Sequence, residues 1–156
     1  MSIKSLCKTE VVTIKKKSSL KEASELMHKQ HVGSLVVVEA FNGNRIPCGI
    51  ITDRDIALTV GSASRPQELG VDQIMQSQPI TAHMADGLYE TITKMRTYGV
   101  KRLPVVDDFG SLFGLISTDD ILSLMGEEIN NLAKVTETQV KVEQGIRIPT
   151  EKRVQL

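Results

Sequence analysis

The stretch Gly49-Ile50-Ile51-Thr52-Asp53-Arg54-Asp55-Ile56 returns 65 residues later as Gly114-Leu115-Ile116-Ser117-Thr118-Asp119-Asp120-Ile121. Each copy consists of a glycine, two aliphatic residues, a hydroxyl residue, two variable residues and an aspartate. Aliphatic residues followed by Ser/Thr-x-x-Asp are typical of a strand that ends at the capped start of a helix. The sequence therefore predicts two strand-to-helix junctions of the same design.

The repeat extends well upstream of both stretches. Residues 3–39 align with residues 71–107 at an offset of 68. The offset changes by three in a Gly/Asn-containing loop, where insertions cost little. A period this long exceeds that of solenoid repeats and indicates two copies of one half-domain. The identical pairs upstream are Thr13/Thr81, Leu20/Leu88, Glu22/Glu90, Met27/Met95, Val32/Val100, Leu35/Leu103, Val37/Val105 and Val38/Val106.

Each copy predicts the element order β-α-β-β-α. In the first copy we expect strands over 11–14, 35–38 and up to Thr52, and helices that begin after Ser19 and at Asp53. In the second copy we expect strands over 79–82, 103–106 and up to Ser117, with helices through 88–95 and over 118–125. The runs at 35–38 and 103–106 are apolar on both faces, which predicts central strands. The first helix of each copy should end near a glycine, Gly33 or Gly99. The helix that begins after Ser19 should bury one face, formed by Leu20, Ala23, Leu26 and Met27.

A half-domain of about 60 residues buries too little surface to be stable alone. We therefore predict a mixed α/β (α+β) fold in which two pseudo-symmetric βαββα repeats pack on each other. The predicted boundaries are 3–62 for the first repeat, 63–70 for a linker and 71–126 for the second repeat. A polar tail over 127–156 has no counterpart in the first copy, and we expect it to be helical at first and then extended or disordered from Gly145 onward.

The composition excludes several classes of protein. The chain has 156 residues with 19 basic and 19 acidic side chains, whereas nucleic-acid and acidic-membrane binders rely on excess basic charge. No apolar run approaches the roughly 18 residues of a membrane span. The N-terminus lacks the apolar core of a signal peptide, so we expect a cytoplasmic protein. Cys7 and Cys48 form no metal-binding pattern and are interpreted as reduced packing residues, like the core-filling methionines Met27, Met75, Met84, Met95 and Met125.

The two junctions carry the residues best suited to a ligand. Unpaired N–H groups and the positive dipole at a helix start suit a phosphate, and the hydroxyl of Thr52 or Ser117 can join them. A carboxylate three residues on, Asp55 or Asp120, can accept hydrogen bonds from a ribose diol. The aliphatic pairs Ile50-Ile51 and Leu115-Ile116 could wall a purine. The same Ser/Thr-x-x-Asp pattern also forms an ordinary capping box, which needs no ligand, and both interpretations stay open here.

Little else in the sequence suggests chemistry. His28 and His31 have a spacing that could place two imidazoles on one metal, but no third ligand completes the set predictably. His83 has no serine or cysteine in a nucleophile context. We therefore expect neither a catalytic residue, nor a metal, nor a catalytic cofactor, and an enzyme acting on nucleotides is the least favoured hypothesis.

Taken together, the repeated βαββα frame, both glycine-led stretches and Val100-Lys101-Arg102-Leu103-Pro104-Val105-Val106-Asp107 resemble the cystathionine-β-synthase (CBS) domain family over about residues 3–125. In that family two such domains pair into a Bateman module, which often binds adenine nucleotides in clefts between the repeats. Similar modules often form disc-like homodimers and regulate attached or partner proteins. The resemblance implies a non-catalytic sensor of AMP, ADP or ATP that passes its occupancy to a regulated partner.

The resemblance also implies roles for single residues. Thr52 and Asp55 would serve one cleft, and Ser117 and Asp120 the other. The main chain at Val12 and Ile80 would contact adenine from the opposite repeat, while Lys101 and Arg102 would hold phosphates. The first copy departs from this pattern because Gly33 and Ser34 occupy the positions of the basic pair. The Ser117/Asp120 cleft should therefore be the better site, although Arg54 could partly compensate at the other cleft or form an exposed salt bridge.

Two alternatives remain at this point. The chain could be a structural adaptor that dimerises and docks a partner without any ligand, its motifs being helix caps. It could also bind another adenosyl ligand, such as NAD or S-adenosylmethionine.

Overall fold

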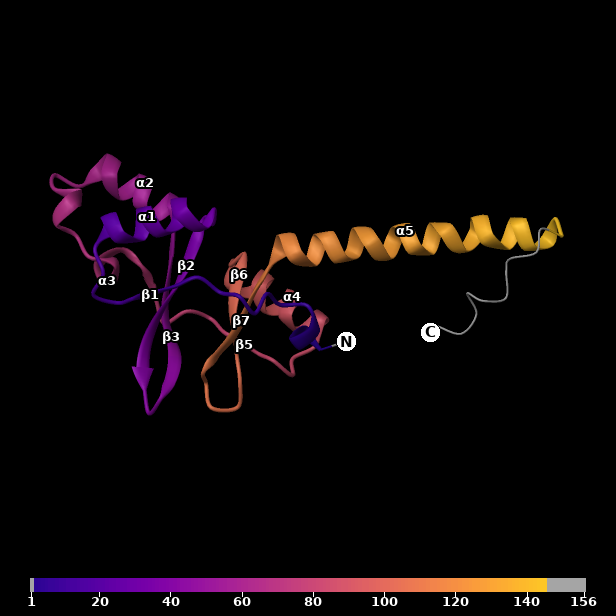
Figure 1. Cartoon of the computed structure of the whole chain (residues 1–156), viewed down its shortest axis with the longest axis horizontal. Coiled ribbons are helices and arrows are strands. Elements are labelled where there is room, and N and C mark those ends of the chain that lie inside the picture. The colour runs from indigo at the N-terminus through magenta and orange to yellow at the C-terminus, as the bar shows by residue number, and fades with distance from the viewer. Residues whose placement is uncertain (1, 146–156) are drawn as a thin grey trace. The chain divides into compact units, whose positions relative to one another are not determined.

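The computed structural model describes residues 2–145, and Figure 1 shows its helices and strands. The chain divides into two compact units, residues 1–118 and residues 119–156. The first unit holds all the strands of both repeats. The prediction of a mixed α/β fold with the order β-α-β-β-α in each copy is confirmed.

The first repeat consists of β1 (Thr13–Lys15), α1 (Leu20–Gln30), β2 (Ser34–Phe41), β3 (Asn44–Thr52) and α2 (Asp53–Ser62). Its sheet has the strand order β1-β2-β3-β4, in which β1 and β2 are parallel and β2 and β3 are antiparallel. As predicted, β2 is a central strand. The hairpin turn places Asn42 and Gly43 at positive φ, the conformation that an Asn-Gly turn supplies most easily.

The second repeat consists of β5 (Ala82–His83), α4 (Leu88–Tyr98), β6 (Arg102–Val106), β7 (Leu112–Ser117) and α5 (Thr118–Glu143). Its sheet has the order β5-β6-β7, again with the predicted central strand in the middle. The β2–β3 and β6–β7 ladders both shift register, between Val37 and Val38 and between Val105 and Val106. These positions correspond in the repeat, so the two copies share even their irregularity.

Short elements that the sequence pattern did not predict join the two repeats. They are the 3-10 helices η1 (Ile3–Ser5) and η2 (Pro66–Glu68), the helix α3 (Val71–Ile74) and the strand β4 (Gln76–Ser77). β4 lies in the N-terminal part of the second repeat but pairs with β3 of the first, with Gln76 opposite Ile50. Lys8 lies in the N-terminal part of the first repeat but pairs with Leu115 of the second. Each copy thus lends its N-terminal segment to the sheet of the other.

The core of the first repeat includes this exchanged segment. Val71 and Met75 lie in the same buried cluster as Leu20, Ala23 and Met27 of α1. The predicted buried face of α1 is confirmed for these three residues, while Leu26 is only partly buried. In the second repeat Ile3 is fully buried, and its amide donates a 2.9 Å hydrogen bond to the carbonyl of Asp86. Since each core needs side chains from both copies, neither repeat is a complete folding unit.

Strand alternation separates the core from the contact between the repeats. Leu35 and Ile51 face each other across the β2–β3 ladder and belong to the α1 core, whereas Val36 and Ile50, one residue along, do not. Val36 and Ile50 are nevertheless buried, and β3 contacts β7 of the second repeat. The second repeat therefore covers the sheet face opposite α1.

Two expectations about strand starts were wrong. β1 and β5 begin later than predicted because residues 8–12 and 76–80 cross from one repeat to the other before the strands start. The first helix of each copy ends near the predicted glycine: the cap of α1 is His31, shortly before Gly33 and in the left-handed conformation with φ of 53°, and the cap of α4 is Gly99 itself.

The C-terminal helix continues into the polar tail. We expected a helix over 118–125 and a tail that is helical at first, and α5 is a single helix of 26 residues that includes both. Met125 on this helix is 40% exposed, so its interpretation as a core residue was wrong. The predicted extended end from Gly145 falls almost entirely outside the described residues.

Candidate functional site

The first predicted junction forms a complete capping box. The hydroxyl of Thr52 accepts a hydrogen bond from the amide of Asp55 at 3.2 Å. Asp55 Oδ2 accepts from the amide of Thr52 at 2.8 Å and from its hydroxyl at 2.7 Å. The capping interpretation is therefore confirmed at this junction. The box uses Oδ2 of Asp55, and within residues 2–145 no hydrogen bond or ion pair to Oδ1 of Asp55 is seen.

The second junction places the predicted basic pair beside the end of β7. Arg102 lies opposite Ser117 in the β6–β7 ladder, and the carbonyl of Lys101 accepts a 2.9 Å hydrogen bond from the amide of Thr118. Asp120 lies in the first turn of α5. Two residues that are far apart in sequence, Arg102 and Ser117, are thus neighbours in the fold.

The first repeat has the same backbone arrangement without the charges. Ser34 lies opposite Thr52, and the carbonyl of Gly33 accepts a 3.1 Å hydrogen bond from the amide of Asp53. A Cβ at Gly33 would lie 3.0 Å from a carboxylate oxygen of Asp53. The two junctions are equal in backbone and unequal in charge, as the sequence predicts. The exposed salt bridge considered for Arg54 is not seen within residues 2–145.

The crossing segments carry the two residues predicted to contact adenine. Val12 follows Lys8 by four residues, and Lys8 pairs with Leu115. Four residues span at most about 14 Å, so the main chain at Val12 lies within that distance of β7 in the opposite repeat. Ile80 stands in the same relation to Gln76 and Ile50 in the first repeat. The carbonyl of Val12 also accepts a 3.2 Å hydrogen bond from the amide of Val36.

The aliphatic pairs do not act as pairs. Ile51 and Ile116 are fully buried, and Ile51 belongs to the α1 core. Because successive side chains on a strand point to opposite faces, Ile50 and Leu115 point to the face shared by the two repeats. A planar ring held between the repeats would contact Ile50 or Leu115. It could not contact Ile51 or Ile116, which point to the opposite face of the sheet.

The glycine that opens each stretch has a structural role that sequence reasoning missed. A Cβ on Gly114 would lie 2.7 Å from the sulfur of Cys7 and 2.9 Å from the carbonyl oxygen of Lys8. A Cβ on Gly49 would collide with the sulfur of Met75 in the same manner. Met75 aligns with Cys7 at the repeat offset of 68. This alignment was the signal available in the sequence. It could be interpreted only once the structure showed that each N-terminal segment crosses over the glycine of the other repeat.

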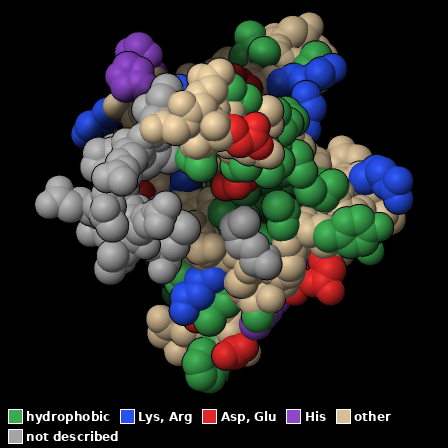
Figure 2. Space-filling model, turned by 90° about the vertical axis from the view of Figure 1, so that its right-hand side faces the viewer, with side chains coloured by type: hydrophobic (Ala, Val, Ile, Leu, Met, Phe, Trp, Pro, Cys, Tyr) green, Lys and Arg blue, Asp and Glu red, His purple; other side chains and the backbone are tan. Residues whose placement is uncertain are grey.

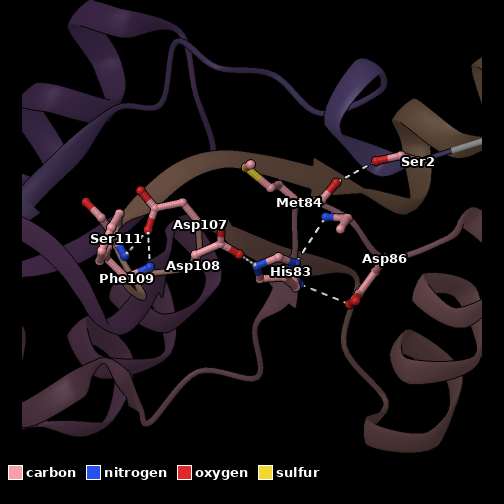
Figure 3. A network of polar contacts seen from close by, with 9 residues as sticks. Ser2, His83, Met84, Asp86, Asp107, Asp108, Phe109 and Ser111 are labelled. Carbon is pink, nitrogen blue, oxygen red and sulfur yellow. Dashed lines mark hydrogen bonds and ion pairs between the residues drawn. The ribbon is translucent and has the colours of Figure 1, made fainter.

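A polar network surrounds His83 in the second repeat (Figure 3). Nδ1 of His83 accepts from the amide of Ala85 at 3.2 Å, so its Nε2, 2.9 Å from Asp108, carries the proton in the neutral ring. The backbone amide of His83 donates to Asp86 at 3.0 Å, and the ammonium of Lys94 lies 3.1 Å from the same carboxylate. Burial raises the pKa of Asp86, but these hydrogen bonds outweigh it and hold the pKa below its ordinary value. These hydrogen bonds hold the turn at His83–Asp86 in place.

A hollow on the first unit lies away from both junctions. It has a volume of about 1080 Å³ and is lined by the end of β1, the β2–β3 hairpin and the turn at Phe109-Gly110. None of the twelve residues predicted to bind a nucleotide lines it. Two of its four cationic residues form ion pairs, since Lys16 lies 3.1 Å from Glu39 and Lys17 lies 2.7 Å from Asp72.

The remaining candidates show no chemistry in the described part of the chain. The rings of His28 and His31 are 6.4 Å apart, and residues 2–145 contain no group of three or more ligand side chains placed to hold a metal ion. Cys7 and Cys48 are free thiols, and burial raises the pKa of both. No helix between residues 2 and 145 combines the length and apolar character that crossing a membrane requires.

Comparison with known proteins places these features in a family. The family model of the CBS domain matches residues 3–61 and 71–127. The chain is 32% identical over 125 residues to the protein MK0525 of Methanopyrus kandleri, covering 80% of this chain and 62% of that protein. It is 31% identical over 109 residues to the homoserine O-acetyltransferase of Methanococcus vannielii, but spans only 22% of that enzyme. The chain thus matches less than two thirds of either relative.

Solved structures share the arrangement of the two repeats. The CBS domain pair of protein MJ0100, in complex with 5'-methylthioadenosine and S-adenosyl-L-methionine, superposes with a TM-score of 0.72 at 26% identity, over 82% of this chain and 98% of that one. The CBS domain protein PAE2072 from Pyrobaculum aerophilum, complexed with AMP, superposes with a TM-score of 0.69 at 25% identity, over 77% and 89%. Both relatives were crystallised with adenosyl compounds.

Proposed function

The chain belongs to the CBS domain family, and from this premise we propose that it is a non-catalytic regulatory module that binds an adenine nucleotide, AMP, ADP or ATP, between its two repeats. The observation that carries the proposal is the position of Arg102 opposite Ser117, with Lys101 beside it, at a helix start. The backbone N–H groups of the helix start, the hydroxyl of Ser117 and the cations of Lys101 and Arg102 would then bind a phosphate together.

The second junction is proposed as the main site. Lys101 and Arg102 supply two positive charges there, whereas Gly33 and Ser34 supply none at the first junction. Asp120 would accept the ribose hydroxyls, and the main chain at Val12 together with the side chain of Leu115 would hold the adenine. Ile116 would support Leu115 from the core side of the strand, since it is fully buried. The first junction, with Thr52, Asp55, Ile50, Ile51 and Ile80, would bind the same class of ligand more weakly.

Isothermal titration of the full chain tests this assignment. We expect AMP or ATP to bind, and the Asp120→Ala variant to bind at least about 10-fold more weakly, because it loses a charge-assisted pair of hydrogen bonds. Asp55→Ala is the matched control at the poorer junction and should leave the tighter binding event unchanged. If no adenine nucleotide binds below about millimolar concentration, the nucleotide proposal fails. If Asp120→Ala binds as tightly as the unaltered chain, the choice of junction fails.

A different adenosyl ligand is the first alternative. The MJ0100 pair was crystallised with S-adenosyl-L-methionine, which carries no phosphate. Titration with S-adenosyl-L-methionine and NAD under the same conditions separates these ligands from AMP. The basic pair favours a phosphorylated ligand, so we expect AMP, ADP or ATP to bind more tightly than S-adenosyl-L-methionine.

A structural adaptor without ligand is the second candidate, favoured by the complete capping box at Thr52 and Asp55. An adaptor predicts that no nucleotide raises the unfolding temperature, whereas a ligand that binds the folded state alone must raise it. Incubation with ATP and Mg²⁺ covers the least favoured hypothesis, since turnover of ATP would contradict the non-catalytic assignment.

We propose that the module forms a homodimer and regulates a partner protein. The sequence predicts that it does so in the cytoplasm. Fewer than a quarter of the residues of the homoserine O-acetyltransferase relative match this chain, so a similar module can accompany an enzyme. This supports a regulatory role.

A further inference from the structure

The hollow described above presents two aromatic side chains to solvent. Phe41, at the end of β2, is 66% exposed, and Phe109, in the turn between β6 and β7, is 79% exposed. They are two of the three phenylalanines of the chain. Hydrophobic side chains also reach the surface elsewhere, as Figure 2 shows for one face of the molecule, and single ones are ordinary. Two large rings at one hollow, contributed by different repeats, are typical of a binding surface.

The turn that carries Phe109 is held by hydrogen bonds (Figure 3). Oδ1 of Asp107 accepts from the amides of Phe109 and Ser111, both at 2.9 Å. The hydroxyl of Ser111 accepts from the amide of Arg45 at 3.2 Å, which joins this turn to the β2–β3 hairpin of the first repeat. Because these contacts already order the turn, a ligand that binds Phe109 would not have to order it.

The hollow has an excess of positive charge. Four cationic residues and one carboxylate line it. The carboxylate, Glu39, pairs with Lys16, while Lys17 pairs with a carboxylate outside the hollow. The other two cations, Lys15 and Arg45, are exposed, and within residues 2–145 neither forms an ion pair. Two positive charges are therefore available to an acidic ligand.

The hollow is also apolar and large. Aliphatic side chains line it besides the two rings, among them those of Val38, Ala40 and Ile46. Its volume of about 1080 Å³ exceeds the roughly 300–1,000 Å³ of small-molecule pockets. A ligand that matches these properties is longer than a typical small molecule and carries both carboxylates and apolar side chains.

We propose that this hollow docks an extended, acidic segment of a partner protein, whose apolar side chains pack against Phe41 and Phe109 and whose carboxylates pair with Lys15 and Arg45. The proposal rests on the regulatory role proposed above, since it names the surface that the regulated partner would contact. It does not depend on nucleotide binding, because none of the residues proposed for the nucleotide lines the hollow.

Charge argues against three other occupants. Residues 146–156 of this chain carry three basic side chains and one acidic side chain, so they would meet like charges in the hollow. The hollow of a second copy is cationic for the same reason that this one is. A single-stranded nucleic acid would match the cations and stack on the rings, but the aliphatic lining favours the side chains of a protein, and the chain as a whole has no net positive charge.

Peptide selection tests the proposal. The immobilised full chain selects from displayed random peptides of about 12 residues, which span up to about 40 Å when extended. We expect the enriched sequences to combine carboxylates with aromatic or aliphatic side chains, and the tightest of them to bind with a dissociation constant of about 1–100 μM in fluorescence anisotropy. Phe109→Ser should weaken this peptide at least about 10-fold. Tyr89→Ser, which removes an 82% exposed ring from α4 outside the hollow, is the matched control and should leave binding unchanged.

Charge reversal tests the recognition of carboxylates. Lys15→Glu combined with Arg45→Glu should weaken the acidic peptide at least about 10-fold and strengthen the same peptide with lysine at each acidic position. Lys29→Glu combined with Arg96→Glu makes the same change in net charge at two exposed positions outside the hollow and should have little effect. Thermal unfolding checks that each variant is folded.

Four results would overturn the proposal: enriched peptides without carboxylates, no peptide that binds below about millimolar concentration, equal weakening by both charge reversals, or tighter binding of an oligothymidylate of the same length. The last result would assign the surface to nucleic acid. Asp120→Ala leaves the hollow intact, so this variant should bind the peptide as tightly as the unaltered chain. Failure of the nucleotide proposal and failure of this one are therefore distinguishable.

Discussion

Gly114 lies directly under Cys7: a methyl group at its Cα would come within 2.7 Å of the Cys7 sulfur. The two residues belong to different repeats of the family fold, since Cys7 lies in the N-terminal part of the first and Gly114 lies in β7 of the second. The glycine that opens each signature stretch is therefore a consequence of the exchange of N-terminal segments between the repeats. Glycine is required at this position because a side chain would occupy the space through which the crossing segment passes.

Gly114→Ala should destabilise the protein by about 1–3 kcal/mol, because the methyl group overpacks against backbone and sulfur. Urea unfolding measures the loss. Gly61→Ala in α2 is the control, since a Cβ there meets no atom within 4 Å and alanine is the better helix former. It should stabilise by up to about 1 kcal/mol. Equal effects of the two changes would contradict the role assigned to Gly114.

Thr52→Ala should cost about 0.5–2 kcal/mol of stability through loss of the cap on α2. Thr52→Ser keeps the hydroxyl and should recover most of that loss. Chemical denaturation of the three proteins, without ligand, gives the comparison. If serine fails to restore stability, the methyl group of Thr52 matters more than its hydrogen bonds to Asp55.

Asp86 should make the protein sensitive to acid. Its pKa is lowered in the folded state, so the carboxylate contributes stability above its unfolded pKa of about 3.9, and this contribution is lost as pH falls through the folded pKa. Asp86→Asn should lower stability at pH 7 and flatten its decline below about pH 4. Glu25→Gln, on an exposed carboxylate 3.7 Å from Lys21, is the control. Parallel pH profiles of the Asp86→Asn variant and the unaltered chain would refute the prediction.

Removing the basic pair should weaken nucleotide binding and reduce its dependence on salt. Lys101→Ala combined with Arg102→Ala is expected to lower ATP affinity at least about 10-fold, with a smaller effect on adenosine, because phosphate contacts are lost. Arg54→Ala removes one positive charge at the poorer junction and should change the tighter binding event little. Calorimetry at two salt concentrations checks both expectations. An unchanged ATP affinity would show that the phosphates lie elsewhere.

Much of the fold follows from local pattern. The apolar runs at 35–38 and 103–106 predict the central strands, the capping boxes at Ser19 and Thr52 predict the helix starts, and Asn42-Gly43 predicts a hairpin. These features depend on residues close together in the chain, so the sequence displays them directly. The same holds for the choice of Thr52, Asp55, Ser117 and Asp120 as candidates, although their binding role stays a proposal.

The missed features all depend on distant residues. No local pattern predicts that Val71 and Met75 complete the core of the first repeat. Which of Ile50 and Ile51 faces the core, and which faces the other repeat, depends on how β3 lies in its sheet.

The residues alone establish the repeat, the order of elements in each copy, the unequal charge at the two junctions and the family. These features can be read from the sequence because each depends only on which residues are present and on their spacing along the chain. The contact of Cys7 with the second repeat and of Met75 with the first required the folded chain. Pairing across a sheet joins residues that no spacing rule connects, and the close approach at Gly114 exists only once two separated segments occupy the same place.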